Sequence, residues 1–288
     1  MKLVTFRRDG RLLPGALLDE VVVDLSRTAS SVLDLVAKQL PEASLVEAAS
    51  EGMRLPAGAV ELAAPIPTPA RNIFCVGKNY TAHAREFQRS GFDATSAGQE
   101  TPEVPIIFTK APSTVIGPSA PIPAYLDPTA SVDYEGELAV VMGRGGRAIS
   151  RADAMQHVFG YMIINDVTSR TQQRTHKQWF LGKSIDGFCP MGPVLLTTNE
   201  VPDPAALRLI TRVNGEVRQD ASVADLIFDI PTLIETISRG ITLLPGDIIA
   251  TGTPEGVGIG FTPPRFLKSG DVVAITIAPI GTLQNSVA

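Results

Sequence analysis

The sequence has few of the residues that characterise disulfide scaffolds and zinc proteins. Its 288 residues include two cysteines, Cys75 and Cys189, and three histidines. Two cysteines do not make a disulfide framework. Thiols and imidazoles this few and this scattered also argue against a closed structural zinc site. We therefore expect buried thiols in a protein of the reducing cytoplasm.

Long apolar runs and an excess of positive charge are also missing. No run approaches the roughly 20 residues that cross a bilayer, and residues 1–8 lack the apolar core of a signal peptide. The net charge is −5, so nothing favours nucleic acid or an anionic membrane as a partner. A hydrophobic content of 44% indicates a soluble globular protein with a substantial core.

Prolines and turn signals divide the chain into a small N-terminal module, residues 1–63, and a larger domain, residues 71–288. In the module, β-like runs precede Ser30-Ser31, which is placed to cap a helix through Leu40. Residues 64–70 carry three prolines within five residues and predict an extended connector.

Short apolar runs dominate the larger domain. They predict strands at Ile73–Val76, Ile106–Thr109, Leu138–Met142, Tyr161–Asn165, Val194–Thr197, Leu207–Val213, Ile248–Ala250 and Val272–Ile277. Asn214-Gly215 is a two-residue hairpin signal. Few helices interrupt these runs, so we predict an α+β, β-rich roll or sandwich and not a doubly wound sheet. Residues 88–105 are polar and patternless, which predicts a mobile loop.

Three carboxylates lie at or near the ends of two of these predicted strands. Glu135 and Glu137 are two residues apart at the start of one strand, so their side chains point to the same face. Asp166 follows the end of the next strand along the chain. Carboxylates that share a face repel one another unless a cation neutralises them, and such a set of oxygen ligands suits Mg²⁺ or Mn²⁺. On its own, the pair of glutamates is more typical of the solvent face of an edge strand.

His83 and Glu86 are candidates for acid–base chemistry. They are three residues apart on an expected helix that Asn79 or Thr81 would cap, so they can touch. A carboxylate beside an imidazole fixes its tautomer and raises its basicity, as a general base requires. A surface His–Glu pair is the alternative interpretation. His157 is expected on a helix packed against the core and His176 in a loop, and neither is given a role.

Arg170 and Gln173 have the same spacing downstream of Asp166, on a helix that Thr168 would cap. A guanidinium and an amide there could hold a substrate carboxylate. A solvated polar helix face explains the pair equally well.

Two further segments carry one candidate each. Gly182-Lys183-Ser184 lacks the upstream glycine of a phosphate-binding loop, so Lys183 is interpreted as a partly desolvated cation near the site. The glycine-dense stretch that begins at Thr251 would let Thr253 offer its hydroxyl to a ligand. A tight turn between strands is the alternative for this stretch.

Together these segments resemble the fumarylacetoacetate hydrolase family, particularly its acylpyruvase-like and 2-oxohept-3-ene-dioate isomerase- and hydratase-like bacterial members. The resemblance covers the catalytic domain, residues 71–288. It depends on the order of these motifs: Cys75-Val76-Gly77-Lys78-Asn79-Tyr80, Asp133-Tyr134-Glu135-Gly136-Glu137, Asn165-Asp166-Val167-Thr168, Gly182-Lys183-Ser184, Cys189-Pro190, Pro245-Gly246-Asp247 and Thr251-Gly252-Thr253-Pro254.

The resemblance implies a β-roll or sandwich that assembles as a homodimer. It also implies Mg²⁺ or Mn²⁺, with Ca²⁺ as a substitute, bound by Glu135, Glu137 and Asp166. It further implies a His–Glu dyad, formed by His83 and Glu86. Lys183 and Thr253 match substrate-facing positions, and Arg170 and Gln173 match positions that contact a substrate carboxylate.

The substrates that the resemblance implies are 2-oxo acids. Our leading hypothesis is hydrolytic C–C cleavage of an acylpyruvate-like 2,4-dioxo acid through a metal-bound enolate. In it the dyad activates water and Lys183 stabilises the oxyanion. Decarboxylation or tautomerisation of oxaloacetate, and isomerisation of an unsaturated 2-oxo dicarboxylate, fit the same metal site and stay open. A non-catalytic Ca²⁺-binding module would explain the carboxylates, but it would leave the dyad and Lys183 unexplained.

Overall fold

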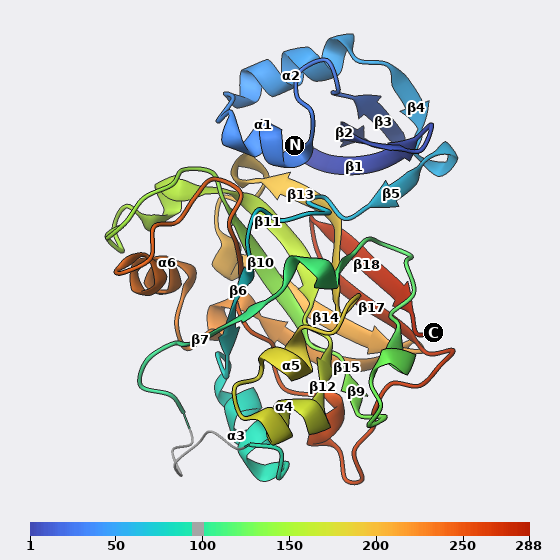
Figure 1. Cartoon of the computed structure of the whole chain (residues 1–288). Coiled ribbons are helices and arrows are strands. Elements are labelled where there is room, and N and C mark those ends of the chain that lie inside the picture. The colour runs from blue at the N-terminus through green and yellow to red at the C-terminus, as the bar shows by residue number, and fades with distance from the viewer. Residues whose placement is uncertain (94–100) are drawn as a thin grey trace.

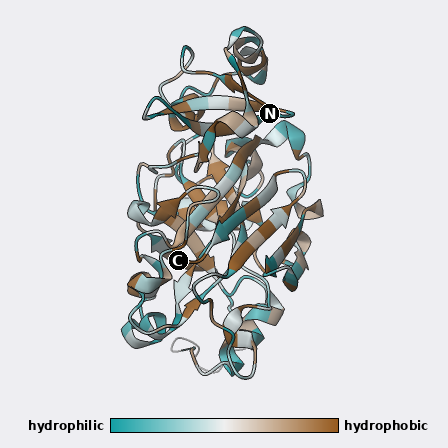
Figure 2. Ribbon diagram, turned by 90° about the vertical axis from the view of Figure 1, so that its right-hand side faces the viewer, coloured by the Kyte–Doolittle hydropathy of each residue, from teal (hydrophilic) through white to brown (hydrophobic). Residues whose placement is uncertain are grey.

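Strands dominate the structure, a computed structural model that describes residues 1–93 and 101–288, and helices gather around them (Figure 1). The strands of the main sheet follow the order β4-β3-β2-β1-β13-β11-β10-β16-β6-β7, with β5 and β8 paired to β1 and β13. A four-stranded sheet has the order β15-β14-β17-β18, and β9 and β12 form a small ribbon. The predicted β-rich α+β class is confirmed, and hydrophobic residues run along the central strands (Figure 2).

The first part of the chain forms five strands and two helices. They are β1 (Lys2–Arg8), β2 (Arg11–Leu18), β3 (Val21–Asp24), α1 (Val32–Ala37), α2 (Glu42–Glu51), β4 (Arg54–Pro56) and β5 (Glu61–Ala63). Ser31 caps α1 through its hydroxyl, but the helix ends at Ala37 and a second helix begins after Pro41. Because β1 also pairs with β13, the sheet continues from this segment into the rest of the molecule. The division at residue 63 stays a prediction.

Each of the eight predicted apolar runs overlaps one of the remaining strands. These strands are β6 (Ile73–Gly77), β7 (Ile106–Lys110), β8 (Val115–Ile116), β9 (Val132–Asp133), β10 (Gly136–Met142), β11 (Val158–Asn165), β12 (Thr168–Ser169), β13 (Cys189–Thr197), β14 (Arg208–Val213), β15 (Glu216–Ser222), β16 (Ile248–Ala250), β17 (Val272–Ile277) and β18 (Gly281–Ser286). Strands β8, β9, β12 and β18 were not predicted. Asn214 and Gly215 have φ values of 52° and 83° and form the predicted hairpin between β14 and β15.

Strand direction brings four chain segments to one edge of the main sheet. Strands β10 and β11 are antiparallel with Gly136 opposite Asn165, so the start of β10 lies beside the end of β11. Strand β16 is antiparallel to β10 and parallel to β6. The ends of β11, β16 and β6 therefore lie at the edge where β10 starts, and the candidate site residues follow or precede these strand ends.

Among the described residues after 71, three of the four α-helices lie near this edge (Figure 1): α3 (Thr81–Arg89), α4 (Arg170–His176) and α5 (Phe180–Lys183). Tyr80 and Ser169 precede α3 and α4 without a side-chain capping bond, so the predicted caps at Asn79, Thr81 and Thr168 are wrong. Thr168 instead donates to the carbonyl of Asp166.

The other helix predictions had mixed outcomes. His176 is the last residue of α4 and not part of a loop, and His157 ends a short 3₁₀ turn. Residues 88 and 89 belong to α3, and residues 94–100 of the predicted loop lie outside the described residues. Helix α6 (Ile230–Ser238) begins after Asp229. Within the described ranges, no helix has both the length and the apolar content to cross a membrane.

Asn79 fixes the junction between β6 and α3. This fully buried side chain donates to the carbonyl oxygens of Thr251 (2.7 Å) and Phe228 (3.0 Å), and it accepts a bond from the Phe228 amide (2.8 Å). One amide group thus ties β6 to the end of β16 and to the segment before α6. It thereby holds in place the turn from which α3 starts.

Replacing Asn79 should destabilise the fold strongly. Asn79→Ala leaves buried backbone groups without partners, and we expect the free energy of unfolding to fall by roughly 2–4 kcal/mol. Urea denaturation would measure the change. Asn72→Ala, at an exposed asparagine that directly precedes β6, is the control and should change the free energy of unfolding by less than about 0.5 kcal/mol. Equal effects of the two changes would contradict the anchoring role.

Candidate active site

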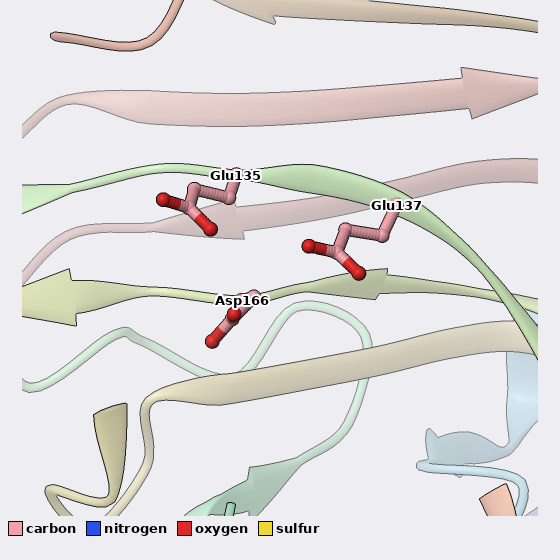
Figure 3. A group of neighbouring side chains, drawn as sticks. All are labelled: Glu135, Glu137 and Asp166. Atoms are coloured by element: carbon pink, nitrogen blue, oxygen red, sulfur yellow. The ribbon is translucent and has the colours of Figure 1, made fainter. Parts of the chain in front are cut away.

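Three buried carboxylates meet where β10 begins and β11 ends. Glu135 directly precedes β10, Glu137 is the second residue of that strand, and Asp166 directly follows β11. Each can offer an oxygen such that all three oxygens lie within 4.8 Å of one another. Both glutamates project from the same strand toward the segment that carries Asp166 (Figure 3). The cluster therefore follows from the alternation of side chains on β10 and from the β10–β11 register.

Cations compensate two of these carboxylates. The Lys183 ammonium donates to Glu135 Oε2 and to Asp166 Oδ2, each at 2.7 Å, and Arg170 Nη1 lies 2.6 Å from Glu135 Oε1. Burial alone would raise the pKa of Glu135, but Lys183 and Arg170 outweigh it and lower that pKa to about 2. Burial likewise opposes the charge on Lys183, but Asp166 and Glu135 raise the pKa of the lysine.

Glu137 has the opposite balance. Burial raises the pKa of Glu137 well above its usual value, and the charges of Asp166 and Glu135 raise it further. The amide of Gly252 donates to its Oε2 at 2.8 Å. A further positive charge among these oxygens would favour the ionised form. A hard divalent cation, which prefers carboxylate ligands, thus fits this donor set.

Lys110 is a site residue that the sequence analysis missed. Its fully buried ammonium donates to Asp166 Oδ1 at 2.7 Å, to the Val167 carbonyl at 3.1 Å and to the carbonyl of Lys183. It therefore neutralises Asp166 from the side away from Lys183 and ties β7 to α5. A lysine that closes an apolar strand was the available signal, but lysines in that position usually reach solvent.

Arg170 and Gln173 lie together, as their spacing predicts. Arg170 Nε donates to Asp133 Oδ2 at 2.8 Å and Nη1 to Gln173 Oε1 at 3.2 Å. Asp133 in turn accepts the amides of Gly258 and Ile259. The third nitrogen, Nη2, is buried and has no hydrogen-bond partner within the described part of the chain. It is a donor that an anionic ligand could use.

His83 and Glu86 contact each other on α3. His83 Nδ1 lies 3.1 Å from Glu86 Oε2, and Glu86 Oε1 accepts the amide of Gly256 at 2.9 Å. The interaction with Gly256 holds the carboxylate in place, and the carboxylate orients the imidazole. Since Nδ1 contacts Glu86, Nε2 is the nitrogen that remains for proton exchange.

Gln219, which the sequence analysis also missed, organises the loop after β16. Its side chain donates to Thr253 Oγ1 and to the Pro254 carbonyl, both at 2.8 Å, and accepts the amide of Gly136 at 3.0 Å. This buried amide therefore links β15 both to the Thr253 loop and to the residue between the two glutamates. No local pattern in the sequence indicates such a contact.

One pocket brings most of the predicted residues together. Its wall includes His83, Glu135, Glu137, Arg170, Gln173, Lys183 and Thr253, and it is completed by Val76, Gly77, Lys78, Phe87, Phe108 and Trp179. Asp166 and Glu86 contact wall residues directly, through Lys183 and His83. All nine residues singled out in the sequence thus belong to one cluster, and the role of each stays a prediction.

Comparison with known proteins gives matches over the whole chain. Residues 72–288 match the family described as "Fumarylacetoacetate (FAA) hydrolase C-terminal". Oxaloacetate tautomerase YisK of Bacillus subtilis is 46% identical over 311 aligned positions, which cover both chains completely.

Solved structures agree with these matches. A fumarylacetoacetate hydrolase from Exiguobacterium antarcticum has 42% identity and a TM-score of 0.85, over 100% of this chain and 99% of that one. Maleylpyruvate hydrolase from Sphingobium sp. SYK-6, solved with manganese(II) and pyruvate, has 32% identity and a TM-score of 0.81 over the same shares. The resemblance inferred from the motifs is confirmed: this chain belongs to the fumarylacetoacetate hydrolase family and is an enzyme.

Proposed function

We propose that this enzyme interconverts the keto and enol forms of oxaloacetate or of a closely related 2-oxo dicarboxylic acid. The observation that carries the proposal is the 46% identity, over the full length of both chains, with an oxaloacetate tautomerase. The pocket supports it, because it combines a carboxylate cluster suited to a divalent cation with a neighbouring imidazole. This reaction was an alternative in the sequence analysis, where hydrolysis came first.

We assign the metal to Glu135, Glu137 and Asp166, with Mg²⁺ or Mn²⁺ as the ion. Carboxylate oxygens suit both, and a family structure at 32% identity contains manganese. When bound, such an ion would act as a Lewis acid and stabilise negative charge that develops on a 2-oxo acid.

The cationic and amide groups of the wall would orient the substrate. Arg170 has a buried donor, Nη2, for a carboxylate oxygen, and Gln173 lies beside it. Lys183, bridging Glu135 and Asp166, would hold its positive charge next to the oxygen that gains charge in the transition state. Thr253, fixed by Gln219, would position a hydroxyl at the same pocket.

His83 would move the proton. Tautomerisation takes a proton from an enol hydroxyl and adds one at the neighbouring carbon, so it needs a group that accepts and donates near neutral pH. Imidazole meets this requirement, and Glu86 would keep Nε2 directed to the pocket by holding Nδ1. Hydrolysis of an acylpyruvate is the second candidate, because the same dyad could activate water and maleylpyruvate hydrolase shares the fold.

A direct assay separates these reactions. Purified protein, stripped of metal and reloaded with Mn²⁺ or Mg²⁺, would be incubated with oxaloacetate and, in parallel, with acetylpyruvate. We expect accelerated metal-dependent change in the ultraviolet absorbance of the oxaloacetate enol without formation of pyruvate. Pyruvate from acetylpyruvate would favour hydrolysis, pyruvate from oxaloacetate would favour decarboxylation, and no acceleration with either acid would refute the proposal.

Removing one carboxylate should weaken metal binding without unfolding the protein. In Glu137→Gln the amide keeps the shape of the side chain but removes its charge, so we expect the affinity for Mn²⁺ to fall by at least about 100-fold. Titration calorimetry with Mn²⁺ would measure it, and the melting temperature of the metal-free protein would check folding. Glu61→Gln, at a largely exposed glutamate, is the control. Unchanged affinity in Glu137→Gln would rule out the assigned ligand set.

Removing the imidazole should slow the reaction and leave the metal bound. For His83→Ala we expect kcat to fall by about 10²- to 10⁴-fold, the usual contribution of a positioned acid–base group. Glu86→Gln should lower kcat by a smaller factor, because Glu86 only orients the imidazole ring. The rate of change of the enol absorbance would give kcat, and calorimetry would check that the affinity for Mn²⁺ is unchanged. A His83→Ala protein with full activity would show that the dyad does not transfer the proton.

A further inference from the structure

Lys78 is a pocket residue with no part in the cluster described above. It follows β6 directly, lies 7% exposed and belongs to the same pocket wall as Glu137, Arg170 and Lys183. Arg170 and Lys183 both form ion pairs with Glu135 of the carboxylate cluster. The ion pair of Lys78 instead goes to Asp93, which follows α3, with Nζ 2.7 Å from Oδ2.

The backbone at Lys78 has a conformation that glycine adopts more readily than lysine. Its φ of +55° lies in the left-handed region, which costs a residue other than glycine or asparagine roughly 1 kcal/mol or more. Glycine would adopt this conformation without strain. The ion pair with Asp93 is one contact of the ammonium group that offsets this cost.

Lys78 and the substrate-orienting arginine both approach the ring of Phe87. Lys78 Nζ lies 5.3 Å from the centroid of the Phe87 ring, and Arg170 Cζ lies 5.9 Å from the same centroid. Two cations thus share one aromatic ring, one paired within the carboxylate cluster and the other paired outside it. Both residues line the same pocket, so both are available to a small molecule with two carboxylates that binds there.

We propose that Lys78 binds the distal carboxylate of a dicarboxylic 2-oxo acid, and that Asp93 is the internal carboxylate which this group replaces. The inference rests on the proposed function and assigns a residue to the second carboxylate of its dicarboxylic substrate. Exchange of one carboxylate for another keeps the buried ammonium paired. The side chain of Asp93, which is 3% exposed in its pair with Lys78, must then turn toward solvent to avoid the penalty of an unpaired buried charge.

The test compares two acids that share the 2-oxo acid end. Binding of 2-oxoglutarate, which has a distal carboxylate, and of 2-oxobutanoate, which has none, would be measured by calorimetry on the Mn²⁺-loaded enzyme. In Lys78→Met we expect 2-oxoglutarate to bind about 10- to 100-fold more weakly, as for a lost charged hydrogen bond, and 2-oxobutanoate within about twofold of wild type. Lys78→Arg should retain the preference.

A reciprocal variant makes the test sharper. Asp93→Asn removes the competing charge, so 2-oxoglutarate should bind at least about twofold more tightly. Equal losses for both acids in Lys78→Met, or weaker binding of 2-oxoglutarate in Asp93→Asn, would overturn the proposal. So would a wild-type enzyme that binds both acids equally or neither. Because binding is measured without turnover, an enzyme that discriminates the acids but fails to tautomerise oxaloacetate would refute only the proposed function.

Discussion

The structure depends on the balance of charge among the buried side chains of the active site. Four carboxylates, Asp133, Glu135, Glu137 and Asp166, face three cations, Lys110, Arg170 and Lys183, with ion-pair distances of 2.6–2.8 Å. Each buried charge would be costly alone, and removing one partner would leave the other uncompensated. Burial raises the pKa of Glu137, and the charges of Asp166 and Glu135 raise it further, because no cation of the set pairs with this carboxylate within the described residues. These pairs therefore constrain every element that contributes to them.

The fold meets this constraint with elements that are distant in sequence. Strand β7 delivers Lys110, the β10–β11 pair delivers the triad, and α4 and α5 deliver Arg170 and Lys183. Backbone amides of the glycine-rich segment complete the arrangement, because Gly252 binds Glu137 and Gly258 binds Asp133. A shift of one strand by one residue would turn the glutamates to the opposite face. Register and charge balance thus support each other.

Local patterns explain which parts of the site could be predicted. The alternation on β10 placed Glu135 and Glu137 on one face, and helical spacing brought His83 to Glu86 and Arg170 to Gln173. Lys110 and Gln219 were missed because their contacts join segments 56 and 34 residues apart, and no periodicity encodes such contacts. The caps were wrong for a related reason: Asn79 and Thr168 form tertiary or local turn contacts that compete with capping.

The charge balance also explains why the substrate cannot be predicted from the motifs of this family. With a divalent ion bound, its two positive charges and those of the three cations would exceed the charges of the four ionised carboxylates by one. That excess suits the carboxylate of any 2-oxo acid, whatever follows the keto carbon. Discrimination among substrates must then come from wall residues outside the balanced set. Lys78, paired with Asp93 and not with the triad, is a charged residue in that position.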